Sequence, residues 1–241
     1  QCHNASIERL QFLQRLGFQR AILARELNLD TIRQMRANTT LELETFVHGA
    51  LCVCYSGQCL MSSMIGGRSA NRGLCAQACR LPYELHRNDD PRPLPAEGEH
   101  VLSPRDLCTV AILEDLCRTG AASLKIEGRM KETDYVKNVT AAYRKQLDSI
   151  FKRRPEYMRS SSGTSHLTFE PQLEKSFNRG FTHYFLHGRT HDISNPNTPK
   201  SMGEPMGRVK ERHSAFLTVA GLKPFHNGDG ACYLDEHGKL Q

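Results

Sequence analysis

Apolar and polar positions alternate with two different periodicities along the first 160 residues of the chain. Apolar residues that recur every three to four positions predict helices over residues 7–16, 29–35, 108–118 and 132–152. Short apolar or alternating runs predict strands over residues 20–24, 41–47, 100–103 and 121–128. Strands and helices that succeed one another in this way favour a parallel sheet with helices packed outside it.

The short connections between these elements predict an α/β fold class, a partial TIM-like (β/α) barrel with a Cys-rich insertion. A closed barrel needs eight strands, so we expect only half of one here, the other half being supplied by further residues or by a partner chain. Active sites of such barrels lie at the carboxyl ends of the strands. The residues at the predicted strand ends are Arg25, Glu26, His48, Ser103, Asp106, Glu127 and Arg129.

The pattern changes after residue 160, where SSSGTS reads as a flexible link. Short β-like runs follow at residues 181–187, 207–212, 215–222 and 231–235, and Asn227-Gly228-Asp229-Gly230 is typical of a tight turn. We therefore expect two domains. Residues 1–160 form the half-barrel with a Cys-rich loop at about 49–82, and residues 165–241 form a small β-barrel-like domain that caps the barrel or holds substrate.

Four cysteines in one glycine-rich stretch carry the most specific chemistry of the sequence. Cys52, Cys59, Cys75 and Cys79 have the spacing C-x6-C-x15-C-x3-C. Four soft thiolates on a flexible backbone suit an iron–sulfur cluster or zinc, although the x6 spacing is less typical of zinc sites. Disulfides are the alternative. The chain opens without a secretory signal and has no apolar run long enough to span a membrane. We therefore expect a cytoplasmic protein, in which disulfides are rare.

The positive net charge of the chain is compatible with a polyanionic partner but does not require one. The formal net charge is +6, with basic residues among the cysteines at Arg68, Arg72 and Arg80. A basic surface attracts phosphates through charge and counterion release. An ordinary solvated surface is the alternative interpretation.

His48, Lys125, Glu127 and Arg129 are the candidate catalytic residues. His48 follows a strand immediately before the cysteines and could transfer a proton or contact substrate; a structural histidine is the alternative. Lys125 and Glu127 alternate along a strand, so we expect them to share a face and to pair inside the barrel. Arg129 at the rim would then bind a carboxylate or phosphate. A purely structural ion-pair network is the alternative.

Several segments carry a family resemblance: ELETFVHGALCVCYSGQC, NRGLCAQACR, SLKIEGRMK and FNRGFT. Together they resemble the peptidase U-32 (collagenase-like) family. The segments GGRSANRG, CRLPY and YVKN are most similar to those of its ribosomal-RNA cytidine hydroxylase branch. Members of the family begin with further residues that form the first barrel strands, so the resemblance implies that this chain lacks them.

The resemblance implies a specific chemistry. It implies a [4Fe–4S] cluster held by Cys52, Cys59, Cys75 and Cys79, with Cys108 as the alternative ligand in place of Cys79. It also implies prephenate as co-substrate or precursor and 5-hydroxycytidine in 23S ribosomal RNA as the product, with tRNA as the second choice of substrate. Cys54 is a spare thiol, and we expect Cys2, Cys117 and Cys232 to serve packing.

Two further classes of function stay open beside an RNA hydroxylase. The family name suggests a protease, yet the chain contains no HExxH zinc motif and no GxSxG nucleophile motif. A non-catalytic scaffold with a structural metal cluster is the third class.

Overall fold

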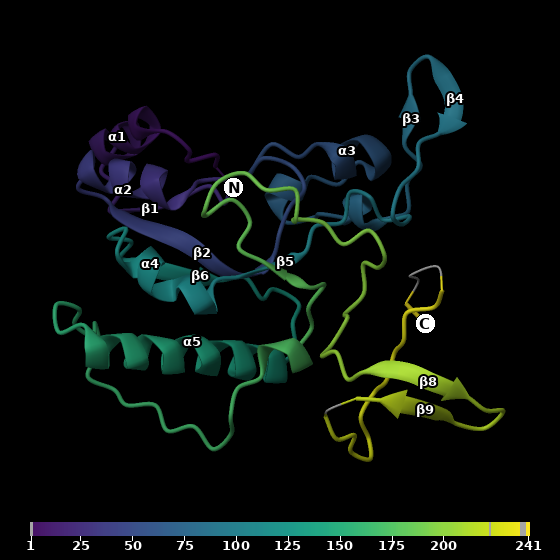
Figure 1. Ribbon diagram of the computed structural model, residues 1–241. Coiled ribbons are helices and arrows are strands. Elements are labelled where there is room, and N and C mark those ends of the chain that lie inside the picture. The colour runs from purple at the N-terminus through teal and green to yellow at the C-terminus, as the bar shows by residue number, and fades with distance from the viewer. Residues whose placement is uncertain (1, 222, 237–239) are drawn as a thin grey trace.

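The computed structural model describes residues 2–221, 223–236 and 240–241, and it shows a mixed α/β protein (Figure 1). The helices are α1 (Ile7–Arg15), α2 (Leu29–Ala37), α3 (Met61–Gly66), α4 (Leu113–Cys117) and α5 (Thr133–Arg153). Single 3-10 turns occur at η1 (Ala70–Arg72), η2 (Ala78–Arg80), η3 (Val110–Ile112) and η4 (Leu173–Lys175). The strands are β1 (Arg20–Ile22), β2 (Glu42–Ala50), β3 (His86–Arg87), β4 (Asp90–Pro93), β5 (Asp106–Cys108), β6 (Ser123–Ile126), β7 (Phe181–Thr182), β8 (Arg208–Arg212) and β9 (Leu217–Ala220).

The main sheet has five strands and is organised around β2. This long strand runs parallel to β1 and β6 and antiparallel to β5, which in turn pairs with β7 in parallel. The α/β class is therefore confirmed. Among the described residues the strands do not close into a barrel, and the antiparallel β5 departs from the all-parallel pattern of a TIM barrel.

The two faces of the sheet differ because side chains alternate along each strand. Leu43 and Val47 of β2 lie in one apolar core with residues of α1, α2, α4 and α5, such as Leu10, Met35 and Val139. The opposite face carries Arg20, Ile22, Glu42, Glu44, Phe46, Ser123 and Lys125, which the registers place side by side. This second face is polar and partly exposed.

Most predicted elements are confirmed, and the differences have local causes. The α2 helix begins where the Asn28 side chain accepts a hydrogen bond of 2.8 Å from the Thr31 amide. Residues 100–103 are a turn instead of a strand, and the strand begins at Asp106. The predicted helix at 108–118 starts later, because Cys108 pairs with His48 in the sheet.

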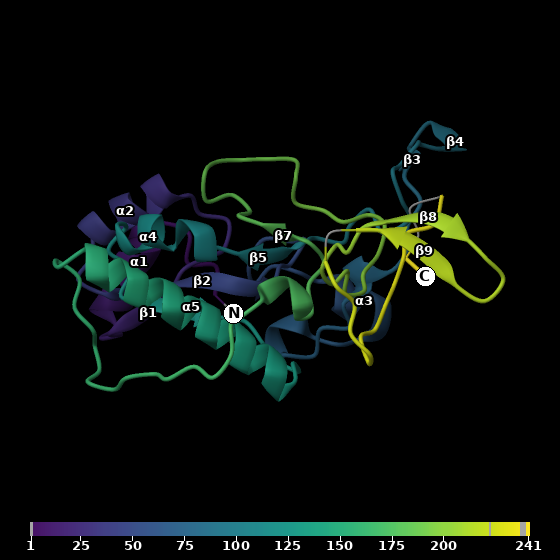
Figure 2. The ribbon, with the colours of Figure 1, turned by 60° about the horizontal axis from the view of Figure 1, so that its bottom comes forward.

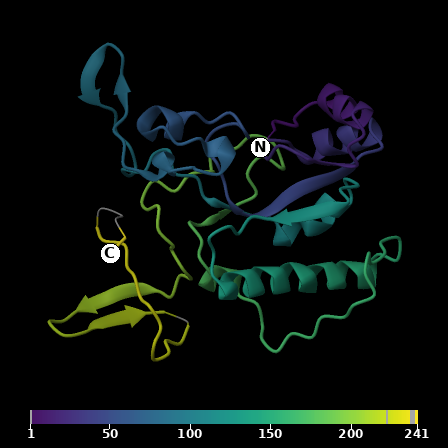
Figure 3. The same ribbon diagram turned by 180° about the vertical axis from the view of Figure 1, so that it is seen from behind.

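The segment after residue 165 is only partly separate from the sheet. Strand β7 joins β5, Leu186 lies in the main core, and the Asn195 amide donates to the Ser103 carbonyl over 2.8 Å. Within this segment, the β8–β9 hairpin stands apart from the sheet (Figures 1 and 3). The predicted run at 231–235 is reduced to a bridge between Leu234 and Leu240, and the run at 215–222 ends on residue 222, outside the described residues.

Candidate functional site

The cysteine loop leaves the sheet at the end of β2 and returns to it at β5. It carries α3, η1, η2 and the β3–β4 hairpin, which projects from the molecule (Figure 1). All nine cysteines of the chain are free thiols. The loop thus places four candidate ligands where β2 ends, as the sequence predicted.

The structure brings Cys52, Cys54, Cys59, Cys75 and Cys79 into one group. Burial, with smaller contributions from the neighbouring Cys59, Cys79 and Cys54, raises the pKa of Cys52 to about 11. Burial also raises the pKa of Cys79, with smaller contributions from Cys75 and Cys59 that Arg80 opposes. These mutual effects show that the four predicted ligands are electrostatic neighbours, with Cys54 beside Cys59.

Short-range hydrogen bonds fix the position of Cys75. Its Sγ accepts from the Gln77 amide at 3.3 Å and from the Ser62 hydroxyl at 3.9 Å. The same Ser62 Oγ accepts from the Ala76 amide at 3.0 Å. Ser62 is buried on α3, so this short helix is tied to the second half of the cysteine loop.

Arg80 is buried under the loop instead of contributing to a basic surface. Its guanidinium donates to the Leu51 carbonyl at 3.1 Å, to Ser103 Oγ at 2.8 Å and to the Pro104 carbonyl. Burial, and then the nearby Arg179, lower its pKa to about 10. A side chain with this pKa is a cation at neutral pH, and it interacts with the thiols of both Cys79 and Cys52.

The donor chemistry of the group fits a thiolate-bound metal site. Four thiolates are a ligand set of both a structural zinc ion and a [4Fe–4S] cluster. In the described part of the chain, no three His, Cys, Asp or Glu side chains are already arranged as ligands of a metal ion. The cysteines therefore supply the donors that either group needs.

An ion pair joins the ends of β1 and β6 beside the cysteine loop. Arg25 Nη2 lies 3.0 Å from Glu127 Oε2, and its guanidinium stacks over Phe46 at 3.8 Å from the ring centroid. The adjacent Glu26 accepts from the Ser56 amide at 2.6 Å. Arg25 and Glu26 thus hold the first turn of the loop, and Arg25 also interacts with the Cys52 thiol.

The predicted pair between Lys125 and Glu127 is wrong. Lys125 Nζ lies 3.9 Å from Glu44, whose carboxylate also accepts 2.8 Å from Ser123 Oγ, while Glu127 pairs with Arg25. Phe46 and Glu44 stand on the same face of β2, so Lys125 meets both of them across the parallel register. Glu42, Glu44 and Phe46 alternate along β2, so the sequence could have placed Phe46 on the same face as the two glutamates.

Arg129 and His48 lie at the predicted rim but have different environments. The Arg129 guanidinium donates to the Gly73 carbonyl, so it links the cysteine loop to the end of β6. His48 is only 2% exposed, and burial lowers its pKa to about 4. A neutral histidine enclosed by rings agrees with the structural alternative. Its predicted catalytic role stays a prediction.

Ser103 and Asp106 reach the rim through the reversed direction of β5. Because β5 is antiparallel to β2, its first residue Asp106 lies opposite Ala50, at the end of β2. Asp106 forms a buried ion pair of 3.1 Å with Arg179, a residue that sequence reasoning did not select. Cys108 lies deeper, and burial raises the pKa of its thiol. The smaller contributions come from Val110, Tyr143 and Glu174, not from any of the four cysteines.

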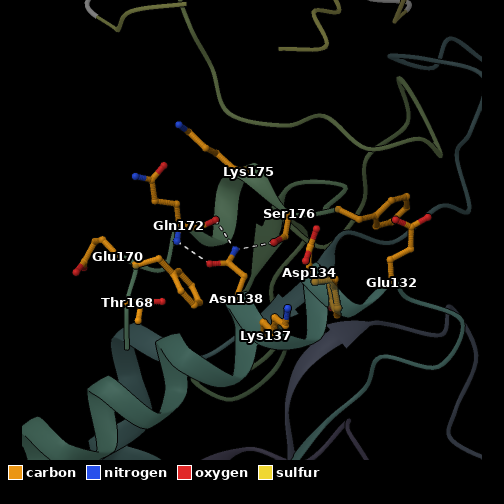
Figure 4. A pocket seen from close by; sticks show the side chains of 12 residues that line it. Glu132, Asp134, Lys137, Asn138, Thr168, Glu170, Gln172, Lys175 and Ser176 are labelled. Carbon is orange, nitrogen blue, oxygen red and sulfur yellow. Dashed lines mark hydrogen bonds between the residues drawn. The ribbon is translucent and has the colours of Figure 1, made fainter. Parts of the chain in front are cut away.

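Two pockets lie away from the four predicted ligands. One of about 960 Å³ lies between the first half of α5 and residues 168–177 (Figure 4). There Asn138 donates to the Gln172 carbonyl and to Ser176 Oγ, both over 2.6 Å, and charged side chains of both signs line the opening. A second pocket of about 500 Å³ is lined by Cys108, His183 and His187 among others. Neither lining includes Cys52, Cys59, Cys75 or Cys79.

In residues 2–221, 223–236 and 240–241 no helix has the length and apolar character needed to cross a bilayer.

Comparison with known proteins identifies relatives that act on RNA. The family profile for peptidase family U32 matches residues 1–196. The chain is 47% identical over 230 residues to the 23S rRNA 5-hydroxycytidine C2501 synthase of Escherichia coli strain K12, covering 95% of the chain and 35% of that protein. It is 30% identical over 284 residues to the tRNA hydroxylation protein P of the same strain, covering 96% of the chain and 60% of that protein.

A relative named as a protease also matches. The collagenase of Porphyromonas gingivalis strain W83 is 32% identical over 192 residues, covering 75% of the chain and 45% of that protein. No solved structure gives a significant match. The chain spans about a third of the length of the rRNA synthase that it matches.

Proposed function

The chain belongs to peptidase family U32, and we propose that it is part of an enzyme that hydroxylates a pyrimidine base of RNA, namely a cytidine of 23S ribosomal RNA. The observation that carries this proposal is the 47% identity, over 95% of the chain, to a 23S rRNA 5-hydroxycytidine synthase. Transfer RNA is the second choice of substrate, because the tRNA hydroxylation protein P is more distant. We place the reaction in the cytoplasm.

We propose that Cys52, Cys59, Cys75 and Cys79 hold a [4Fe–4S] cluster. Their grouping and their free thiols support this assignment. Two buried guanidiniums support it further, because Arg25 interacts with Cys52 and Arg80 interacts with both Cys52 and Cys79. Four thiolates would bring negative charge into the site, and neighbouring cations stabilise thiolates. When bound, such a cluster supplies one-electron chemistry.

The residues around the cysteines would position the loop and the substrate. Glu26 and Arg129 tie the loop to the ends of β1 and β6, and the Arg25–Glu127 pair joins these two ends, so the loop is held over the sheet. Lys125 is partly exposed on the polar face and offers a cation to a carboxylate-bearing co-substrate such as prephenate. In this proposal the prephenate dependence is a property of the whole enzyme, of which this chain is one part.

Proteolysis has less support. The relative named collagenase favours it, but a nucleophile needs a base within hydrogen-bonding distance. Across the described residues, no Ser, Thr or Cys side chain hydrogen-bonds to a histidine.

Mass spectrometry of ribosomal RNA tests the proposed reaction. Deletion of the gene should abolish 5-hydroxycytidine from 23S rRNA, and the wild-type gene should restore it. A Cys59→Ser gene should fail to restore it, whereas Cys117→Ser, outside the cysteine group, should succeed. Persistence of 5-hydroxycytidine in the deletion strain would show that the assignment is wrong.

A further inference from the structure

The β8–β9 hairpin exposes an unusual combination of side chains. All five residues of β8 are exposed, and the hairpin extends away from the main sheet (Figures 1 and 3). An isolated two-stranded hairpin is marginally stable in water. A ligand that covers it would therefore stabilise it as well as bind it.

Its cations have no partners within the described chain. Arg208, Lys210 and Arg212 form no ion pair or side-chain hydrogen bond with any described residue, while the intervening Glu211 faces His213 at 3.4 Å. Several other exposed cations are ion-paired, among them Arg33 with Asp30, Arg118 with Glu114 and Lys145 with Glu170. The strand therefore presents three cations that have no partner among the described residues, and the register shift between Val209 and Glu211 distributes them over both faces of the hairpin.

A stacked pair of rings lies at the turn that follows β8. The rings of His213 and Phe216 lie 4.2 Å apart at an angle of 23°, and the His213 amide donates to the Phe216 carbonyl over 2.9 Å. Phe216 is nevertheless 61% exposed. One face of this aromatic platform is therefore open to solvent, beside the row of cations.

We propose that this hairpin binds single-stranded RNA, an inference that rests on the proposed function. Arg208, Lys210 and Arg212 would contact phosphates of the RNA backbone, and a base would stack on Phe216. Cations that follow the backbone together with an aromatic side chain that accepts any base are the common means of binding single strands. The phosphates of the RNA supply the negative charge that these three cations do not find within the described chain.

The location of the hairpin suits this role. It lies at the same end of the molecule as α3 of the cysteine loop, opposite α1 and α2 (Figures 1 and 2). An RNA strand held by the hairpin would extend towards the loop that carries the proposed chemistry. The hairpin would thus increase the affinity for RNA, whereas other parts of the enzyme would select the base to be modified.

Fluorescence anisotropy with a short labelled single-stranded RNA tests the proposal. The triple variant R208A/K210A/R212A should lower affinity by about tenfold or more, and it should reduce the slope of log affinity against log salt by about 2, at about 0.7 per phosphate contact. The Phe216→Ala variant should lose about tenfold, and Phe216→Trp should retain affinity.

The control is R33A/R118A/K145A, which removes the same charge from cations that are ion-paired. It should stay within about threefold of the wild type, because these cations are already neutralised. Circular dichroism should show that all variants keep the fold. Equal affinity of the two triple variants, or a wild-type chain that does not bind RNA, would overturn the hairpin assignment.

Two other outcomes separate the hypotheses. If the hairpin variants bind RNA like the control but change the molar mass in light scattering, the hairpin contacts protein instead of RNA. RNA binding that survives these substitutions refutes only the hairpin assignment. The proposed function is decided separately, by 5-hydroxycytidine in the deletion strain.

Discussion

His48 lies among the rings of Tyr135, Tyr143 and Phe181, at centroid distances of 6.0, 5.6 and 5.7 Å. Desolvation in this setting disfavours the charged imidazolium, which is why the pKa falls to about 4. At neutral pH the side chain is therefore an uncharged core residue. The protonation state of His48 is therefore set by the residues that bury it and not by the usual pKa of a histidine.

This environment predicts a pH dependence of stability. The folded-state pKa of about 4 lies below the usual 6.5, so the stabilising contribution is complete above pH 6.5 and is lost as pH falls towards 4. The loss amounts to about 3 kcal/mol at about 1.4 kcal/mol per pKa unit. Urea unfolding at several pH values should show that His48→Gln flattens this dependence, whereas exposed His166→Gln leaves it unchanged. A wild-type slope in the His48 variant would contradict the prediction.

Arg80 is the second residue whose burial defines its role. Replacing it with methionine would leave the Leu51 and Pro104 carbonyls without a donor, and buried carbonyls are costly to leave unsatisfied. We expect Arg80→Met to lower the free energy of unfolding by about 3 kcal/mol. Exposed Arg72 in the same loop is the control, and Arg72→Met should change it by less than about 0.5 kcal/mol. Similar urea midpoints for the two variants would refute the structural role of Arg80.

At the scale of elements, the junction between β2 and β6 depends on one glycine. Gly49 has φ +107°, and a Cβ there would lie 2.2 Å from the Glu127 carbonyl oxygen. The Glu127 amide donates to the His48 carbonyl over 2.8 Å, so the two backbones are in close contact. This contact positions Glu127 beside Arg25 at the start of the cysteine loop.

A side chain at residue 49 should therefore disrupt the site. We expect Gly49→Ala to cost about 2 to 4 kcal/mol of unfolding free energy, because both the backbone conformation and the contact with Glu127 oppose a Cβ. Gly66→Ala on α3 is the matched control, since no atom lies within 4 Å of its Cβ position. Chemical denaturation should separate the two variants, and a Gly49→Ala protein as stable as Gly66→Ala would exclude the steric argument.

At the scale of the whole molecule, the cysteine loop is a long insertion held by a few ties to the sheet. The Arg80 contact with Ser103, the Arg129 contact with Gly73 and the Glu26 contact with Ser56 connect it to three different parts of the chain. A metal cluster bound by four of its cysteines would add the strongest tie. Ligands that bind only the folded state stabilise it.

Metal removal should therefore lower the melting temperature. Anaerobically purified wild-type protein should carry about four irons and four sulfides per chain, and an iron chelator should lower its melting temperature. The Cys59→Ala variant should lack iron and show no further effect of the chelator, whereas Cys117→Ala should behave as the wild type. A colourless wild-type protein with stoichiometric zinc would contradict the cluster assignment.

The sequence by itself determined the local elements and the candidate ligands. Hydrophobic periodicity predicted α1, α2 and α5 and strands β1, β2 and β6, because each pattern reflects the face that a regular element buries. The spacing of four cysteines identified the loop. These features depend on neighbours in the chain, and so they can be derived from it.

Only the tertiary structure decided the partners of charged residues and the direction of β5. Lys125 meets Glu44 instead of Glu127, Arg80 is buried instead of exposed, and Asp106 reaches the rim because β5 is antiparallel. Each outcome depends on contacts between residues that are far apart in sequence, which periodicity does not contain. The separation of the β8–β9 hairpin from the sheet has the same cause, since β7 pairs with β5 whereas β8 pairs with β9.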